Sequence, residues 1–252
     1  MRLRSRWLLL SLLAAALALP VAAAHAGTIR PQIVGGQNAP SPYPFMVSIQ
    51  VSSQTHWCGG VLVAPSWVVS AAHCDGWFPL PQLRFRVGSV DRTAGGTVAS
   101  ADRAVSHPTA DLVAYHLTAP VTETPVPIAG AAPDGSALRL LGWGCTQPVT
   151  GGCAEQPRIL QQLDTTLVTP SRCVSARHPG GIGAGQLCVD SPGGAGSCYG
   201  DSGGPALAHG TGGGWLLAGI TSDGTTDVCA AGPSIYVSAL AAKAWIQQVT
   251  SQ

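Results

Sequence analysis

Charged side chains are scarce in this sequence of 252 residues. Asp, Glu, Lys and Arg together make up 10% of it, and Lys243 is the single lysine. The first 32 residues hold four of the 13 basic residues and none of the 12 acidic ones, so the remainder has a net charge of −3. A nucleic-acid-binding protein normally shows a basic stripe, and this composition argues against such a partner. Apolar and aromatic residues reach 46%, which is enough to form a sizeable core.

The apolar run near the N-terminus is too short for a membrane span. It covers residues 7–19, whereas a transmembrane helix needs about 20 residues. Three arginines precede it, and Ala24-His25-Ala26 after it fits the small-x-small rule for signal cleavage. The pattern therefore favours a signal peptide at 1–26 over a retained membrane anchor. We expect an extracellular protein with no membrane association once the signal is removed.

Cys-x-x-Cys pairs are absent from the sequence, although it has eight cysteines. Zinc knuckles use such close pairs, and the spacing between Cys145 and Cys153 is too wide for one. An even number of cysteines in an exported protein favours disulfides instead. Eight cysteines allow about 105 pairings, so spacing alone does not choose among them. We expect no metal and no other cofactor.

Short apolar or alternating runs, separated by Gly, Pro, Asn and Asp, fill the sequence after residue 32. Such punctuation is typical of an all-β barrel or sandwich. A helix is predicted over residues 239–249, because Ala241, Trp245 and Val249 recur at four-residue spacing. Four prolines within residues 120–133 predict a connection between two halves of similar size. The strand-like runs are residues 45–51, 67–70, 83–90, 112–117, 137–143, 159–167, 215–222 and 234–237.

The segment Gly200-Asp201-Ser202-Gly203-Gly204-Pro205 carries the strongest chemical signal. Glycines on both sides of a serine let the backbone turn tightly and aim N–H groups at a developing oxyanion. An incidental serine in a glycine-rich turn is the plain alternative. The segment also fits the Gly-x-Ser-x-Gly elbow of α/β-hydrolases, in which an acid and then a histidine follow the serine. After Ser202 the only histidine is His209, with no Asp or Glu between them, so the esterase interpretation lacks its base.

The opposite order, His then Asp then Ser, is available upstream of Ser202. His73 follows the apolar run 67–70 and precedes Cys74, which is a rigid place to hold an imidazole as general base. Asp111 opens the run 112–117, and its carboxylate would fix the imidazole tautomer. Taken singly, each of these residues also has a structural explanation. The other histidines considered as the base are His56, His107, His116, His178 and His209.

Several short motifs occur in a fixed order along the chain. They are Ile33-Val34-Gly35-Gly36, His56-Trp57-Cys58-Gly59-Gly60, Ala71-Ala72-His73-Cys74, His107-Pro108 with Asp111-Leu112-Val113-Ala114, Gly142-Trp143-Gly144, and the segment from Cys198 to Pro205. Together they resemble the landmarks of the chymotrypsin/trypsin family of serine proteases, and an ordered set is far more specific than one motif. The resemblance implies two packed six-stranded antiparallel β-barrels with a C-terminal helix, within a peptidase domain at 33–252. The short loops and the many Ala and Gly residues resemble bacterial members more than vertebrate ones.

The resemblance implies a role for each residue of the site. Ser202 attacks the substrate carbonyl, His73 acts as general base and then as acid, and Asp111 orients His73. The N–H groups of Gly200 and Ser202 form the oxyanion hole. The protein is then a secreted serine endopeptidase that acts on protein or peptide substrates, as a monomer open to protein protease inhibitors. The implied disulfides are Cys58–Cys74, Cys173–Cys188 and Cys198–Cys229, which leaves Cys145 and Cys153 to pair with each other.

The resemblance also implies activation by cleavage. In this family, cleavage frees the amine of an isoleucine, here Ile33, which then pairs with the acid before the serine, here Asp201. The segment left after signal removal, residues 27–32, would be a short propeptide, and it ends in Gln32 rather than in Arg or Lys. The activating protease is therefore either the enzyme itself or a foreign one.

The resemblance places Gly196 at the floor of the primary specificity pocket, where trypsin-like members have Asp. Gly224 leaves one wall open, Ser234 reduces the depth, and Ser222 contacts both the substrate backbone and the catalytic Asp. We expect cleavage after uncharged residues rather than Arg or Lys, with side chains such as Leu or Met first and aromatics second. Asp223 stands where the family usually has Trp, which weakens any simple transfer of specificity.

The alternative function is that of a catalytically impaired relative that acts as a binding module. Such proteins usually lose a triad residue, and here all three are present. Asp223 and Gln32 are the departures that favour this alternative. Asp190 and Asp227 add acidic groups in or near the specificity loops, either as solvated charges or in contact with substrate.

Overall fold

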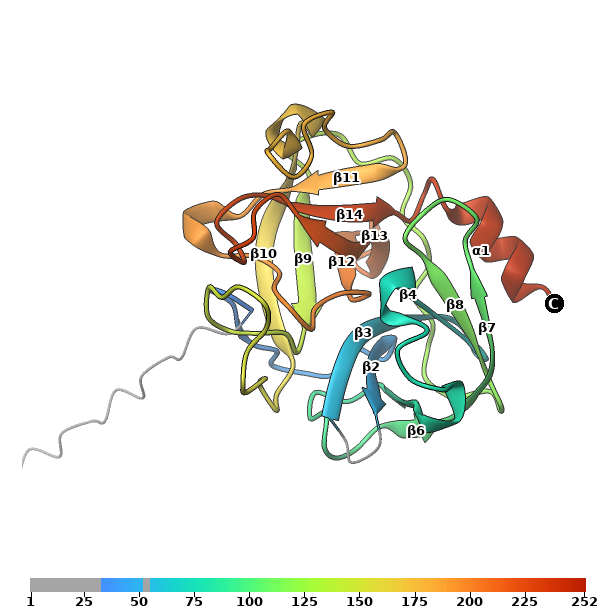
Figure 1. The fold of residues 1–252 in the computed structure, drawn as a ribbon. Helices are drawn as coiled ribbons and strands as arrows, with labels where there is room; N and C mark the ends of the chain where they lie inside the picture. Colours follow the sequence, from blue (N-terminus) through green and yellow to red (C-terminus); the bar gives the residue numbers. More distant parts are fainter. Residues whose placement is uncertain (1–32, 52–54) are drawn as a thin grey trace, which may run out of the picture.

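The structure is a computed structural model that describes residues 33–51 and 55–252 (Figure 1). The predicted signal peptide and propeptide, at 1–32, lie outside these residues. In the described part the chain forms two antiparallel β-sheets that pack against each other, followed by a C-terminal α-helix (Figure 1). No helix within these ranges is long and apolar enough to cross a membrane.

The first sheet is built from the N-terminal half of the chain, with strand order β6-β5-β2-β3-β4-β8-β7. Val69 pairs with Val61 and Ala114, and all three are buried, because the inward-facing positions of β4 and its two neighbours are apolar. The strands are β2 (Met46–Val51), β3 (Thr55–Ala64), β4 (Trp67–Ser70), β5 (Arg84–Val87), β6 (Thr97–Ala99), β7 (Ala101–Ser106) and β8 (Val113–Leu117).

The second sheet has the order β1-β10-β11-β14-β13-β12-β9. Strand β9 also pairs with β10, so six of these strands close into a barrel and β1 is added outside it. Closure removes the unpaired edges that an open sheet would expose. The strands are β1 (Gln37–Asn38), β9 (Ala137–Gly142), β10 (Gln161–Val168), β11 (Gln186–Val189), β12 (Pro205–His209), β13 (Trp215–Gly224) and β14 (Ser234–Ser238).

The predicted all-β fold with two barrel-like sheets is confirmed, and the strand count differs for a local reason. Strands β6 and β7 are separated only by Ser100, which interrupts the ladder. Counted as one bent strand, they leave six strands in the first sheet. Each strand-like run of the sequence contains a strand, whereas β1, β3, β6, β7, β11 and β12 lie outside those runs.

The C-terminal helix α1 spans Lys243–Thr250 and begins four residues later than predicted. The preceding residues form a turn, in which Ser238 accepts hydrogen bonds from Ala241 N–H at its Oγ and from Ala242 N–H at its carbonyl. Ile246 and Val249 on the apolar face are buried in the same core as the first sheet, and α1 lies beside β7 and β8 (Figure 1). The C-terminal end of the chain thus packs against the N-terminal half.

Candidate active site

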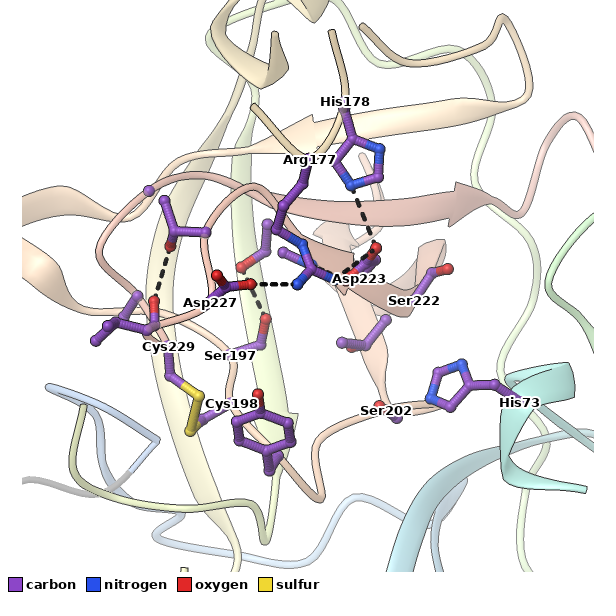
Figure 2. Close-up of a pocket in the computed structure, with 18 of the residues that line it drawn as sticks. His73, Arg177, His178, Ser197, Cys198, Ser202, Ser222, Asp223, Asp227 and Cys229 are labelled. Atoms are coloured by element: carbon purple, nitrogen blue, oxygen red, sulfur yellow. Dashed lines mark hydrogen bonds and ion pairs between the residues drawn. A yellow bond between two sulfur atoms is a disulfide. The ribbon is translucent and has the colours of Figure 1, made fainter. Parts of the chain in front are cut away.

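A cavity of about 570 Å³ brings the three predicted catalytic residues together. His73 lies in the 3₁₀ turn Ala72–Cys74 after β4, and Asp111 lies two residues before β8. Because β4 and β8 are paired neighbours, these two residues meet although 38 positions separate them. Ser202 lies three residues before β12 of the other sheet. The cavity is therefore lined by residues of both sheets' halves of the chain (Figure 2).

The Asp111 carboxylate holds His73 at two points. Oδ1 accepts the His73 backbone N–H at 2.9 Å, and Oδ2 lies 2.8 Å from Nδ1 of the ring. Ser222 Oγ also donates to Oδ2, at 2.6 Å. Since a carboxylate only accepts, Nδ1 carries the proton and Nε2 is left free as a base.

The same contacts shift both pKa values. The hydrogen bond with Asp111 raises the pKa of His73 above 6.5 against the opposing effect of burial, and the charge of Asp223 adds to the rise. Burial tends to raise the pKa of Asp111, but the hydrogen bonds from His73 and Ser222 outweigh it, so this pKa is lowered. Asp111 is thus ionised at neutral pH and stabilises a protonated His73.

Ser202 lies beside the His73 ring, and both residues line the same cavity (Figure 2). In the described ranges its Oγ makes no hydrogen bond, and contacts of this kind often tighten only when substrate is bound. Its carbonyl accepts the N–H of Gly59 at 2.8 Å, which ties the serine to β3 of the first sheet. Ser202 is therefore fixed relative to the sheet that holds His73.

The backbone around Ser202 leaves two N–H donors without a protein acceptor, those of Gly200 and Ser202 itself, as far as the described residues go. Gly200 has a φ of 94°, which favours glycine, and a Cβ there would lie 2.5 Å from Gln156 Nε2. Two free donors on either side of one residue suit a developing oxyanion.

His56 supports this turn from below the active-site surface, a role that sequence reasoning missed. Its Nε2 donates to the Gly200 carbonyl at 2.9 Å, so its Nδ1 accepts from Ser48 Oγ at 2.7 Å. Burial lowers the pKa of His56 to about 4, and the ring is neutral at pH 7. The sequence places His56 in the motif that precedes the His73 motif, but a motif does not reveal that its ring contacts Gly200 and Ser48.

Asp201 is a buried carboxylate, 1% exposed. Its two oxygens accept the N–H groups of Gly144 and Cys198, at 2.8 and 2.9 Å. Burial nevertheless raises the pKa of Asp201 to about 7. No basic side chain of the described chain hydrogen-bonds to it. Ile33 is also buried, at 1% exposed.

The predicted pocket residues divide into two sets. Ser222, Gly224 and Ser234 line the cavity with Ser202. Gly196 does not: it is buried, and its N–H donates to the carbonyl of Val34 at 2.9 Å. The cavity therefore does not reach Gly196.

An ion-pair cluster covers one side of the cavity (Figure 2). Arg177 Nη1 contacts Asp227 at 2.6 Å and its Nη2 contacts Asp223 at 3.1 Å. His178 Nε2 lies 3.2 Å from the other oxygen of Asp223. Asp190 is outside the cavity, where it pairs with Arg172 at 3.4 Å. Asp223, which stands where the family usually has Trp, is thus paired with Arg177, a residue that no sequence motif singled out.

Four disulfides hold the loops around the site, and the described residues contain no free cysteine. Cys198–Cys229 joins the segment before Ser202 to the loop after β13. Within the same ranges, no group of three or more His, Cys, Asp or Glu side chains could hold a metal ion. The other pairs are Cys58–Cys74, Cys145–Cys153 and Cys173–Cys188.

Comparison with known proteins gives one consistent result. The family model Trypsin matches residues 33–246. A trypsin of Phaedon cochleariae is 33% identical over 238 residues, covering 87% of this chain and 88% of that protein. Serine protease 1 of Rattus norvegicus is 32% identical, over 96% of this chain and 97% of that protein. Neuropsin, a serine protease expressed in the limbic system of mouse brain, matches in structure with a TM-score of 0.72 at 26% identity, covering 82% of this chain and 94% of that one.

These matches and the two-sheet fold define a serine endopeptidase, a hydrolase of protein or peptide substrates. The chain belongs to the trypsin family.

Proposed function

We propose that the protein hydrolyses peptide bonds through an acyl-enzyme, with Ser202 as nucleophile, His73 as general base and acid, and Asp111 as the residue that orients His73. The observation that carries this proposal is the double attachment of His73 to Asp111, at 2.9 and 2.8 Å, in the cavity that Ser202 lines. This arrangement fixes the tautomer that leaves Nε2 able to take the serine proton.

In the proposed reaction, His73 Nε2 takes the proton of Ser202 as Oγ attacks the carbonyl carbon. The N–H groups of Gly200 and Ser202 stabilise the oxyanion, and one such donor is worth about 10²–10³ in rate. His73 then gives the proton to the leaving amine. Water attacks the acyl-enzyme by the same route and restores Ser202.

We propose that the enzyme becomes active when the Gln32–Ile33 bond is cut. A buried carboxylate needs a partner, and Asp201 has two N–H groups but no cation among the described side chains. The new ammonium of Ile33 supplies one. Ile33 also has a φ of 39°, an outlier for a β-branched residue, and cleavage removes the peptide bond that defines this torsion.

The proposed specificity is for uncharged residues before the scissile bond, with Leu or Met first and aromatics second. Gly196 brings no acid to the pocket, and the acids at the cavity rim, Asp223 and Asp227, are engaged by Arg177. A substrate Arg or Lys would therefore meet no free carboxylate at the end of the pocket.

The binding-module alternative is tested by covalent labelling. A fluorophosphonate probe should label the processed protein, and Ser202→Ala should abolish the label while leaving the urea midpoint unchanged. If the processed protein is folded but is not labelled by the fluorophosphonate, the catalytic function is rejected and a binding function is favoured. Peptide hydrolysis that survives in Ser202→Ala would reject Ser202 as the nucleophile.

We also propose that the protein is secreted after removal of residues 1–26, matures by loss of residues 27–32, and acts as a monomer open to protein protease inhibitors. The four disulfides support an oxidising compartment. Protein N-terminal sequencing and intact mass of the exported material test both cuts; a mature start other than Ile33 would reject the activation scheme.

A further inference from the structure

Two serine hydroxyls line a buried part of the cavity. Ser197 precedes the nucleophile segment and Ser234 begins β14, and both line the cavity. Ser197 Oγ donates to Ser234 Oγ at 2.8 Å, and Ser234 is only 3% exposed. A Cβ at Gly196, the residue before Ser197, would lie 2.6 Å from Ser191 Oγ, so the space beside Gly196 is already filled. A side chain entering the cavity therefore meets a polar surface of hydroxyls.

This pair still has hydrogen-bonding capacity. Ser197 uses its proton on Ser234, and the Ser234 hydroxyl donates to no acceptor in the described chain. The fully buried Tyr236 hydroxyl makes no well-aligned hydrogen bond there either. Burial raises the pKa of Tyr236, and the hydroxyls of Thr221 and Ser197 lie close enough to oppose the rise. Tyr236 does not line the cavity, so the groups offered to a ligand are the free O–H of Ser234 and the unused lone pairs of the serine pair.

The charges around the cavity exclude most ionised ligands. Asp223 and Asp227 outnumber Arg177, and His178 is already against Asp223. A substrate carboxylate would meet net negative charge, with the guanidinium already engaged. A substrate ammonium would meet only hydroxyls in this part of the cavity. A neutral group that both accepts and donates hydrogen bonds matches these partners, and a primary carboxamide is such a group.

We infer that the pocket selects glutamine before the scissile bond, and that the bond between Gln32 and Ile33 of the precursor is therefore a substrate of the mature enzyme. This inference rests on the proposed function: it keeps the preference for uncharged residues but places a carboxamide ahead of Leu and Met, because the hydroxyl pair makes the pocket lining polar. Ser202 Oγ bonds to the carbonyl carbon of Gln32, and the C–N bond to Ile33 breaks with its amine taking a proton from His73. Water then releases the Gln32 carboxylate and restores the serine.

The cut is made by one molecule on another. The Val34 carbonyl accepts the N–H of Gly196, which does not line the cavity, so Val34 is held away from the Ser202 of its own chain. Processing should therefore start slowly and accelerate as mature enzyme accumulates, with an initial rate that rises with added mature enzyme.

The test separates maturation from specificity. A Gln32→Arg precursor is matured with immobilised trypsin, which yields the same chain from Ile33 onward whatever its own preference. This enzyme is added to the full-length Ser202→Ala precursor, which cannot process itself. We expect a new N-terminus at Ile33 by protein sequencing. In the same inactive background, Gln32→Met should slow the cut about fivefold, because it keeps length without hydrogen bonds. Gln32→Glu should slow it about tenfold or more.

Pocket variants test the hydroxyl pair on matched peptides that differ only in Gln, Met, Glu or Arg before the bond. Ser197→Ala and Ser234→Ala should each bring the Gln-to-Met ratio of kcat/KM close to one, with cleavage after Met retained. Ser191→Ala removes a buried hydroxyl that does not line the cavity and should leave the ratio unchanged.

Two results would overturn the inference and leave the proposed function standing: an enzyme that cleaves Met peptides as fast as Gln peptides, or one that leaves the inactive precursor intact at Gln32. Dominant cleavage after Arg or Glu would overturn it as well. An enzyme that cleaves no peptide and takes no fluorophosphonate label would instead reject the proposed function.

Discussion

The buried Asp201 should make the uncleaved precursor less stable as pH rises. Burial raises the pKa of Asp201 from 3.8 to about 7. The folded precursor therefore binds this proton more tightly than the unfolded chain. The contribution of the neutral Asp201 carboxyl to the free energy of unfolding is fully present below pH 3.8. It falls as pH rises and is lost above about pH 7.

The size of this effect follows from the two pKa values. A rise of this size corresponds to about 4 kcal/mol, at about 1.36 kcal/mol for each pKa unit. About 2.5 kcal/mol of it should fall between pH 5 and pH 8, because the unfolded carboxyl is already mostly ionised at pH 5. Asp201→Asn replaces the titrating carboxyl with an amide that does not ionise. It also loses one of the two hydrogen bonds from Gly144 and Cys198, which lowers stability by a similar amount at every pH.

The assay is urea unfolding followed by tryptophan fluorescence, in the Ser202→Ala background so that no processing occurs. Between pH 5 and pH 8, the Asp201 protein should lose about 2.5 kcal/mol more unfolding free energy than Asp201→Asn. The difference between the two proteins cancels other titrating groups, including His56, whose lowered pKa acts in the opposite direction. Equal changes in unfolding free energy in both proteins would refute the claim that folding raises the pKa of Asp201.

The mature form provides the matched control. Once the Ile33 ammonium faces Asp201, the charged carboxylate is stabilised and its pKa should fall. In the processed Ser202→Ala protein, the extra loss of unfolding free energy at high pH, relative to Asp201→Asn, should then be smaller. A pH dependence identical to that of the precursor would contradict the proposed pairing of Ile33 with Asp201.

Three further predictions concern catalysis in the processed enzyme. Ser222→Ala removes the 2.6 Å hydrogen bond to Asp111 and should lower kcat/KM about three- to tenfold in active-site-titrated enzyme; an unchanged value would show that the bond has no catalytic effect. Deprotonation of His73 should give kcat/KM an acid limb with a midpoint above 6.5, and Asp223→Asn should lower that midpoint, since Asp223 raises the pKa of His73; an unmoved midpoint would reject this coupling. His56→Phe should lower kcat about tenfold at nearly constant KM by releasing the turn that carries the oxyanion donors, whereas a change in KM alone would assign His56 to substrate binding.

The three residues that meet in the candidate active site could be selected from the sequence because each stands in a short local motif. The glycines around Ser202, the position of His73 beside a cysteine, and Asp111 at the start of an apolar run each need only neighbouring residues to be recognised. The order of these segments excluded the α/β-hydrolase elbow. The alternation of short apolar runs likewise determined the all-β class and most of the strands.

The tertiary structure alone decided which distant groups meet. Arg177 and Asp223 are 46 positions apart, and Ser197 and Ser234 are 37 apart. Neither pair has a local pattern, because a single hydrogen bond or ion pair between loops leaves no periodicity in the sequence. The structure also placed Gly196 outside the cavity.

By itself, then, the sequence determined the fold class and the candidate catalytic residues with their order, since short-range patterning encodes strands and motifs. Tertiary structure decided which polar groups line the pocket together: Asp223 paired with Arg177, and the hydroxyl pair of Ser197 and Ser234. The physical reason is that pocket polarity depends on which buried groups satisfy each other, and these groups become neighbours only when β13, β14 and the loops before Ser202 pack together.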